Sequence, residues 1–198
     1  MNDNNLVLNS PEYWAMRYAS GDWENRGGNL QQTSFAQSLV HEIPQEIKDK
    51  INGLSICDVN CAFGYSLDVF KKSFPDSEMF GIDFVAEATD EASKRFPQFS
   101  FNNELIDKYD CLISSNSLEH IREYKDVLKD YIKHSNKFVI LMIPYNEDIG
   151  DGIGEHVVSF NENSFSDKID KFKKVFFKEF ICEWWMGEQM IVIYENSQ

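Results

Sequence analysis

Two carboxylates, a turn of small residues and two histidines are the side chains of this sequence whose types and spacing could do chemistry. The first carboxylate, Asp58, lies near the end of the apolar run 54–59, and the residues 60–64 after it read Asn-Cys-Ala-Phe-Gly. A helical apolar pattern follows over 66–74. A strand that enters a helix through such a turn offers backbone N–H groups and the positive end of the helix dipole to a ligand. The pattern therefore predicts a binding turn for a nucleotide-like cofactor.

The glycine positions of this turn separate two kinds of cofactor pattern. The nicotinamide-binding pattern G-x-G-x-x-G would place its glycines where the chain has Asn60, Ala62 and Tyr65. In the pattern (Asp/Glu)-x-G-x-G-x-G, the acid and the last glycine are matched by Asp58 and Gly64, and Ala62 is a small substitute. Asparagine tolerates a left-handed backbone better than other non-glycine residues, so Asn60 is compatible with this turn.

A second acid ends a second apolar run. The strand pattern 78–83 closes with Asp83, which lies 19 positions after Gly64. A carboxylate at this place can accept both hydroxyl protons of a ribose, and a helix N-cap is the structural alternative. Two strands that end in an acid at this spacing favour a nucleoside-binding site.

The stretch 109–121 joins a third apolar run to small polar residues and a charged pair. Ser115 and Asn116 come where the strand pattern ends, and Glu119 and His120 follow shortly after. Asn116 and Glu119 also have the spacing of a capping box, which would make Glu119 structural. His120 could act on a ligand, or it could pack or cap a helix.

His156 lies in an acidic segment, 144–160, which contains three glycines and resembles a mobile active-site loop. An imidazole titrates near neutral pH, so His156 could take a proton from an acceptor hydroxyl, with Glu155 orienting it. A loop histidine bonded to backbone is the structural alternative. The nearby acids could bind a divalent cation, but we interpret them as a solvated loop and assign no metal ligand: Glu147, Asp148, Asp151 and Glu155.

Apolar periodicity predicts the elements that must position these residues. Strand patterns at 54–59, 78–83, 98–102, 110–115 and 137–144 alternate with helical patterns at 66–74, 86–95 and 117–133. This alternation predicts a parallel sheet with helices on both faces. Two further strand patterns, 175–183 and 189–194, are joined by a link too short for a crossover, so one final strand must run antiparallel.

Three helical patterns and no strand pattern precede residue 54. They cover 11–20 and 31–40, and the third begins near Pro44. We therefore expect residues 1–50 to form a helical cap on a domain that spans residues 51–198. Aromatic rings near the start could form a lid that favours a cationic group, or could pack as an ordinary core: Tyr13, Trp14, Tyr18 and Trp23, with Arg17 between them.

The composition restricts the class of partner. The chain has 198 residues and a formal net charge of -14, which disfavours nucleic acid and anionic lipid. No apolar run approaches the length of a membrane span, and we identify no signal peptide. The four cysteines lack zinc-site spacing, and we interpret them as buried thiols of a cytoplasmic protein: Cys57, Cys61, Cys111 and Cys182.

Taken in this order, the turn 58–64, the strand that ends in Asp83 and the segment 114–120 resemble the class I S-adenosylmethionine-dependent methyltransferases. The likeness covers about residues 50–198, includes the antiparallel ending, and is closest to small-molecule O-methyltransferases, including those of sugar and polysaccharide pathways. The Asn-Pro-Pro-Tyr or Asp-Pro-Pro-Tyr tetrapeptide typical of enzymes that methylate base or amide nitrogens is absent after the fourth strand. The resemblance implies an α/β Rossmann-like three-layer sandwich. Its seven-stranded, mostly parallel sheet would have one antiparallel strand near the C-terminus.

The resemblance also implies a site for S-adenosylmethionine, with S-adenosylhomocysteine as product. Asp58 and the turn residues Asn60, Cys61, Ala62 and Gly64 would hold the methionine part. Asp83 would bind the ribose, Phe84 would lie beside the adenine, Asn103 or Glu104 near its amino group, and Ser115 with Asn116 near the methionine end. His156 and His120 are the catalytic candidates.

By the same resemblance, the reaction would move a methyl group to a hydroxyl of a small polar acceptor, such as a sugar or polysaccharide precursor. A non-catalytic methyltransferase-fold protein that binds or scaffolds a partner is the alternative, because the turn lacks two glycines. A nicotinamide oxidoreductase is a second alternative, against which the three non-glycine positions argue. We expect neither a nucleic acid nor a membrane as partner, and the sequence leaves the oligomeric state open.

Overall fold

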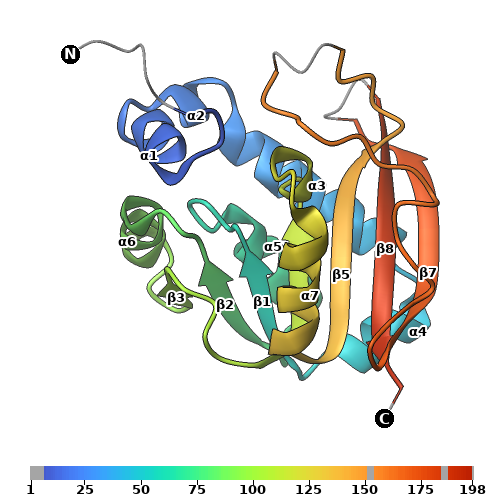
Figure 1. Ribbon diagram of the computed structural model, residues 1–198. Coiled ribbons are helices and arrows are strands. Elements are labelled where there is room, and N and C mark those ends of the chain that lie inside the picture. The colour runs from blue at the N-terminus through green and yellow to red at the C-terminus, as the bar shows by residue number, and fades with distance from the viewer. Residues whose placement is uncertain (1–6, 151–153, 184–186, 198) are drawn as a thin grey trace.

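The computed structural model describes residues 7–150, 154–183 and 187–197 and has an eight-stranded sheet between two layers of helices (Figure 1). The strand order is β3-β2-β1-β4-β5-β8-β7-β6. The strands are β1 (Ser55–Val59), β2 (Glu78–Ile82), β3 (Ser100–Asn102), β4 (Tyr109–Ser115), β5 (Ser135–Tyr145), β6 (Lys168–Ile169), β7 (Phe172–Ile181) and β8 (Glu188–Asn196). The predicted Rossmann-like class is confirmed. The expected seven strands are eight, because the two-residue β6 pairs with β7.

The pairing of the strands explains the antiparallel ending. Strands β1 to β5 are parallel to one another. Strand β8 inserts between β5 and β7 and is antiparallel to both. A chain that leaves β7 through a short connection has to return beside it in the opposite direction, as the length of the link predicts.

Alternating side chains of the sheet enter two separate hydrophobic cores. In β5, Ile140 belongs to the core under α3 (Gly28–Glu42), α4 (Gln45–Ile51) and α5 (Tyr65–Ser73). The next residue, Leu141, belongs to the core under α7 (Tyr124–His134). This alternation is the two-residue period of a strand that is buried on both faces. The remaining long helix, α6 (Ala86–Arg95), packs beside β3 and contacts α1.

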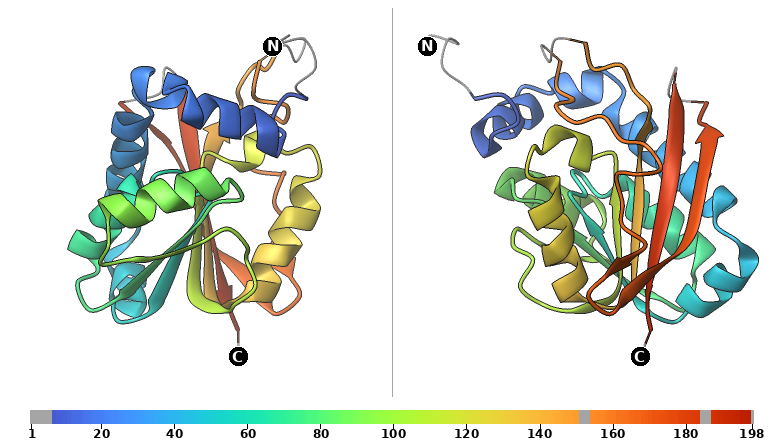
Figure 2. Two further views of the ribbon diagram at one scale, coloured as in Figure 1. Left: turned by 90° about the vertical axis from the view of Figure 1, so that its left-hand side faces the viewer. Right: turned by 45° about the vertical axis from the view of Figure 1, so that its right-hand side comes forward.

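The N-terminal helices divide between the core and the upper edge of the sheet. The short helices α1 (Pro11–Ala19) and α2 (Asp22–Asn25) lie above the carboxyl ends of the first strands (Figures 1 and 2). By contrast, α3 and α4 bury residues in the same core as the sheet, including Leu39 and Ile51. The helical content expected before residue 54 is confirmed, and the division of the chain into 1–50 and 51–198 stays a prediction.

The single helix expected over 117–133 is wrong. The structure has a 3-10 turn, η1 (Leu118–His120), and then α7, with extended backbone at Ile121 between them. The carbonyl oxygen of Glu119 accepts the backbone N–H groups of Val157 and Val158, at 2.7 and 3.1 Å. That carbonyl is the one a continuous helix would bond to residue 123, so a distant segment ends the helical run.

The capping box expected between Asn116 and Glu119 is also absent. Asn116 has a positive φ of 48°, and η1 is preceded by Ser117, whose side chain makes no capping hydrogen bond. The side-chain amide of Asn116 donates instead to the Ser115 hydroxyl, at 3.2 Å. Glu119 therefore has another role than the one its spacing indicated.

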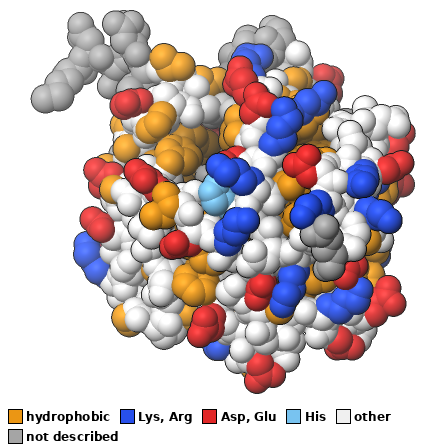
Figure 3. All heavy atoms as spheres, turned by 60° about the horizontal axis from the view of Figure 1, so that its bottom comes forward, with side chains coloured by type: hydrophobic (Ala, Val, Ile, Leu, Met, Phe, Trp, Pro, Cys, Tyr) orange, Lys and Arg blue, Asp and Glu red, His pale blue; other side chains and the backbone are white. Residues whose placement is uncertain are grey.

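The molecular surface carries both basic and acidic side chains. On the face below the strands, basic and acidic side chains alternate and do not gather into one basic patch (Figure 3). Among the described residues, no helix is both long and apolar enough to cross a bilayer.

Candidate functional site

A cavity of about 370 Å³ lies where the carboxyl ends of β1, β2 and β4 meet the N-terminal helices. Parallel strands bring their carboxyl ends to one edge of the sheet, so residues far apart in the sequence converge there. The cavity is lined by nine of the thirteen predicted site residues: Asp58, Asn60, Ala62, Asp83, Phe84, Ser115, Asn116, His120 and His156.

The turn after β1 has a left-handed backbone at each of the three positions that glycine occupies in the expected pattern. The φ angles are 64° at Asn60, 43° at Ala62 and 78° at Gly64. A Cβ at Gly64 would lie 2.8 Å from the ring of Phe101, so this position also needs the space of a glycine. The turn thus keeps the backbone of the glycine pattern although two of its glycines are replaced.

Two of the predicted turn residues shape the turn from outside the cavity lining. The backbone N–H of Gly64 donates to the carbonyl oxygen of Cys61, at 2.8 Å, which closes the turn. The Cys61 side chain is buried and its sulfur packs close to Gly81 of β2. The Cys61 carbonyl also accepts the side-chain amide of Gln32, at 2.7 Å, which ties the turn to α3.

The two strand-end acids are almost fully buried and both face the cavity. Asp58 is 3% exposed and accepts a hydrogen bond from the Ser66 hydroxyl at the start of α5. Burial raises the pKa of Asp58 to about 7. The Asp83 carboxylate accepts the backbone N–H groups of Ala62, at 2.8 Å, and Val85, at 3.0 Å. Burial raises the pKa of Asp83 to about 6, against the lowering effect of these two bonds.

The residues expected around an adenine are only partly brought together. Phe84 lines the cavity and is 44% exposed, which leaves its ring accessible to a planar ligand. Asn103 and Glu104 are exposed and stand outside the lining of this cavity. Their contact with a ligand stays a prediction.

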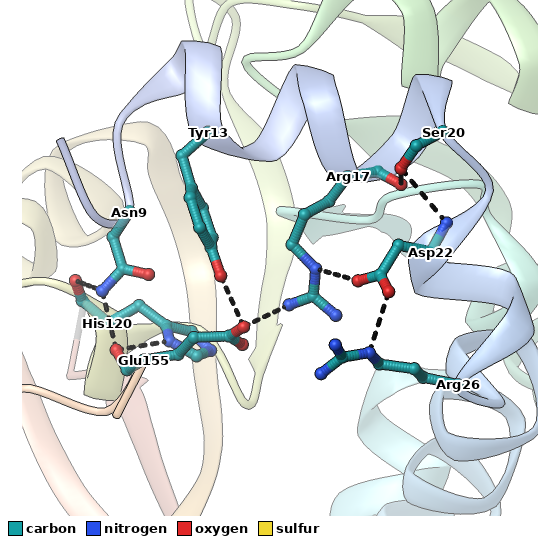
Figure 4. Close-up of polar contacts among 8 residues, drawn as sticks. All are labelled: Asn9, Tyr13, Arg17, Ser20, Asp22, Arg26, His120 and Glu155. Atoms are coloured by element: carbon teal, nitrogen blue, oxygen red, sulfur yellow. Dashed lines mark hydrogen bonds and ion pairs between the residues drawn. The ribbon is translucent and has the colours of Figure 1, made fainter. Parts of the chain in front are cut away.

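Helix α1 covers the cavity and is held down by Glu155. Among the described residues, Trp14, Arg17 and Tyr18 of α1 line the cavity, together with Trp23 of α2. Figure 4 shows Tyr13 and Arg17 pointing from α1 to the Glu155 carboxylate, with distances of 2.6 Å from the Tyr13 hydroxyl and 2.6 Å from Arg17 Nη1.

The covering helix is further secured by an ion pair and by a close glycine contact. Arg17 also pairs with Asp22, at 2.9 Å, and is 9% exposed (Figure 4). The ring of Trp23 packs so closely on Gly28 that a Cβ there would lie 2.3 Å from it. Four of the five residues predicted for a lid thus line the cavity, and their role as a lid stays a prediction.

The two histidines face each other with ring centroids 4.8 Å apart. Nδ1 of His120 lies 3.0 Å from the Glu155 carbonyl oxygen, which can only accept, so this nitrogen carries the proton. Nδ1 of His156 lies 2.6 Å from the Glu147 carboxylate. Glu155 was expected to orient His156. The structure gives that bond to Glu147, whereas the Glu155 backbone orients His120. Burial lowers the pKa of His120 to about 4, so its ring is neutral at physiological pH.

Glu119 is the residue of the site whose environment the sequence did not predict. It is fully buried, it lines the cavity, and within the described part of the chain both its carboxylate oxygens lack a hydrogen-bond partner. Burial raises its pKa to about 8. An unpaired buried carboxyl is costly, which points to a ligand for it.

Asn9 was also missed, because it precedes the first predicted helical pattern and belongs to no motif. Its side-chain amide donates to two carbonyl oxygens, those of His120 at 3.1 Å and Glu155 at 2.7 Å (Figure 4). Its φ of 63° is left-handed, which asparagine tolerates. No local pattern reveals a residue whose partners lie more than a hundred positions away.

Comparison with known proteins agrees with this geometry. Residues 29–184 match a family described as a methyltransferase domain. The magnesium protoporphyrin IX methyltransferase of Synechocystis PCC 6803, solved with bound SAH, is 16% identical. The similarity covers 99% of this chain and 90% of that one, with a TM-score of 0.63.

Two further solved structures share the fold. In a complex of the Haloferax volcanii Trm112 methyltransferase activator with a putative methyltransferase, one chain is 12% identical. The similarity covers 98% of our chain and 100% of the matched chain, with a TM-score of 0.69. The plantazolicin methyltransferase BpumL, in complex with SAH, is 14% identical over 95% of this chain and 91% of that one, with a TM-score of 0.63. A comparison with curated proteins gave no match.

Proposed function

The chain belongs to the class I S-adenosylmethionine-dependent methyltransferases, and from this premise we propose that it transfers a methyl group from S-adenosylmethionine to a hydroxyl oxygen of a small polar acceptor. A sugar or a polysaccharide precursor is the acceptor class we favour. The observation that carries the proposal is the convergence, in one cavity, of a left-handed turn, two buried acids and two oriented histidines.

Residues of the cavity fit the ammonium and the ribose of the cofactor. Asp58 is a buried carboxylate that would pair with the methionine ammonium, and Asp83 keeps lone pairs on both oxygens for the ribose hydroxyls. The side-chain oxygen of Asn116 is buried and has no hydrogen-bond partner among the described residues. Such an acceptor at the wall of the cavity would be satisfied by a donor of the ligand.

The aromatic residues of the lid fit the charge of the donor. Rings of Trp14, Tyr18 and Trp23 line the cavity, and aromatic faces attract a cation such as a sulfonium. The bound sulfonium supplies an activated methyl carbon and a good leaving group. The protein then contributes by aligning donor and acceptor and by excluding water, which α1 does from above.

The histidines are our proposed groups on the acceptor side. Because Nδ1 of each ring faces an acceptor and donates to it, Nε2 is the nitrogen that can accept a proton from the acceptor hydroxyl. His156 has the geometry of a positioned base, with Glu147 holding its tautomer as a carboxylate does in other dyads. His120 would then act as the second polar group near the acceptor oxygen.

The solved neighbours leave the acceptor open. By their names, one acts on magnesium protoporphyrin IX and another on plantazolicin, and coclaurine N-methyltransferase was solved with N-methylheliamine. The preference for a hydroxyl therefore depends on the polar lining of the cavity and on the two histidines. We further propose a cytoplasmic location, because all four cysteines are buried free thiols.

Calorimetric titration with S-adenosylhomocysteine tests the cofactor part of this proposal. We expect one binding site for S-adenosylhomocysteine per chain. The substitution Asp83→Asn should lower the affinity for S-adenosylhomocysteine at least tenfold. The absence of binding at millimolar ligand would instead support a non-catalytic protein that keeps the fold. Release of S-adenosylhomocysteine in the presence of hydroxylated, amine and carboxylate acceptors then tests the reaction, and turnover with amines alone would contradict O-methylation.

A further inference from the structure

Three side chains with metal-ligating atoms converge at the wall of the cavity. One carboxylate oxygen of Glu119 and one ring nitrogen each of His120 and His156 lie within 4.8 Å of one another. Glu119 and His120 come from η1, and His156 comes from the segment after β5. The hydrogen bonds of Val157 and Val158 to the Glu119 carbonyl fasten the two segments together beside the cluster.

The hydrogen bonds around the rings fix the tautomer that a metal needs. His120 donates from Nδ1 to a backbone carbonyl, and His156 donates from Nδ1 to the Glu147 carboxylate. Nε2 is then the nitrogen that each ring would present to a cation. A ligating histidine almost always donates its other N–H to a carbonyl or carboxylate in this way.

Glu119 supplies the independent sign of a ligand. Its two oxygens are buried at the cavity wall and make no hydrogen bond with the described residues. A carboxylate in such surroundings is stabilised by a positive charge placed against it. Both arginines of the described lining are paired with other acids, Arg17 with Glu155 and Asp22, and Arg26 with Asp22.

We propose that Glu119, His120 and His156 bind a divalent transition-metal ion whose remaining coordination positions face the cavity. Two imidazoles and one carboxylate suit Zn²⁺, Mn²⁺, Fe²⁺ or Co²⁺ better than Mg²⁺ or Ca²⁺, which prefer oxygen ligands. Bond lengths of about 2.1 Å place neighbouring ligand atoms roughly 3 to 3.5 Å apart. Metal binding therefore has to draw the three side chains closer together.

This ion would define the acceptor of the reaction, an inference that depends on the proposed function. A cation next to the methyl donor would bind the acceptor through an oxygen atom and lower the pKa of its hydroxyl. The new C–O bond would form as the C–S bond breaks, and the hydroxyl proton would leave to solvent water. In the metal-loaded protein, His156 is a ligand and the cation replaces it in activating the hydroxyl.

Titration of the purified full-length protein with Co²⁺ tests the site without relying on activity. The buffer contains millimolar Mg²⁺, so that Mg²⁺ rather than Co²⁺ occupies the surface carboxylates, which are numerous in a chain of net charge -14. We expect saturable visible absorption bands for one Co²⁺ per chain. Glu119→Gln and His156→Ala should each weaken Co²⁺ binding at least tenfold. Glu147→Gln, which removes the carboxylate behind His156, should weaken it about 10- to 100-fold.

The controls replace the same residue types at exposed positions. His41→Ala and Glu123→Gln lie outside the cavity lining and should leave the Co²⁺ affinity unchanged. Glu119→Gln keeps the shape of the side chain and replaces a buried carboxyl by a neutral amide, so we expect it to fold. Circular dichroism of each variant checks this, and Glu147→Gln supplies a second test should one of the ligand variants unfold.

The outcomes separate this inference from the proposed function. Absence of a saturable Co²⁺ spectrum, or equal affinity in Glu119→Gln and Glu123→Gln, would overturn the metal site. Binding of S-adenosylhomocysteine by chelator-treated protein is measured in parallel. If that binding persists while Co²⁺ binding fails, the methyltransferase proposal stands without the metal. If Co²⁺ binds and S-adenosylhomocysteine does not, the metal site stands and the methyltransferase proposal fails.

Discussion

The side-chain amide of Asn60 donates to the Tyr131 hydroxyl oxygen, at 3.1 Å, and so joins the turn after β1 to helix α7. Asn60 thereby does two things that a glycine at its position could not do together. It adopts the left-handed backbone, with a φ of 64°, and it fixes the turn against the neighbouring helix. The replacement of the expected glycine is thus compatible with a rigid turn.

Loss of this bond should loosen the turn. We expect Tyr131→Phe to lower the free energy of unfolding by about 1 kcal/mol, because one hydrogen bond is lost and the Asn60 amide loses its acceptor. Urea denaturation measures this change. Asn60→Gly removes the same bond but relaxes the backbone, so it should cost less than Tyr131→Phe. A larger loss in Asn60→Gly would mean that the Asn60 side chain has further contacts.

The left-handed backbone at Ala62 should determine how substitutions there change the free energy of unfolding. Ala62→Gly relieves a left-handed alanine, which costs about 1–2 kcal/mol, and adds the flexibility of glycine, which costs about 0.5–1 kcal/mol. We therefore expect a small gain in the free energy of unfolding. Ala62→Val places a β-branched residue at a φ of 43° and should be destabilising by more than 1 kcal/mol. Similar stabilities of the two variants would contradict the φ assigned to this turn.

The raised pKa of Asp58 predicts two pH dependences of opposite sign. Burial raises its pKa from 3.8 to about 7, so folding favours the protonated form. Relative to Asp58→Asn, the ligand-free protein should therefore lose stability as the pH rises from about 4 to 7.

In the proposed complex, the ammonium of S-adenosylhomocysteine would favour the ionised form of Asp58. The affinity of the protein for S-adenosylhomocysteine should therefore fall by up to tenfold per pH unit as the pH drops below about 7. Calorimetry over this pH range measures the affinity, and Asp58→Asn should remove its slope. An affinity of the parent protein that stays constant between pH 5 and pH 7 would rule out the pairing with Asp58.

Arg17 and Glu155 should be energetically coupled. Their atoms lie 2.6 Å apart and Arg17 is 9% exposed, so removal of Glu155 leaves a poorly solvated guanidinium with Asp22 as its remaining acid partner. In a double-mutant cycle with Arg17→Met and Glu155→Gln, we expect a coupling energy of about 1–2 kcal/mol for unfolding. Both single variants should also weaken S-adenosylhomocysteine binding. Additive effects would show that α1 is held down by other contacts.

His156 should affect turnover more than cofactor binding. We expect His156→Ala to lower turnover about a hundredfold or more, with little change in the affinity for S-adenosylhomocysteine. Glu147→Gln should lower turnover less, because it leaves the imidazole in place but weakens its orientation. His41→Ala is the matched control on an exposed part of α3. Unchanged turnover of His156→Ala with the true acceptor would remove His156 from the reaction.

The parts of this molecule that sequence reasoning could predict are those determined by local pattern. Strand β5 is apolar on both faces, so its burial follows from its composition. Asp58 and Asp83 were found because an acid at the end of a buried strand is conspicuous. The break after η1 could not be found in this way, because it depends on Val157 and Val158 reaching the Glu119 carbonyl from a segment far along the chain.

The partners of the loop histidine were misjudged for the same reason. Glu155 precedes His156 directly, so sequence proximity favoured it as the orienting acid. Its side chain turns instead to Tyr13 and Arg17, and Glu147 folds back to His156 from nine positions away. Residues that neighbour in the sequence point in different directions in an extended segment, and no periodicity reveals which one returns.

The attachment of Glu155 to α1 has a kinetic consequence. Asn9 and Arg17 hold the backbone and the side chain of the residue that directly precedes His156. If α1 moves away to let the cofactor exchange, the segment that carries His156 would lose these restraints. We expect closure of α1 and assembly of the acceptor side to be one event, so that a molecule open to solvent is not competent to react. Hydrolytic loss of the methyl donor during each opening would thereby be suppressed.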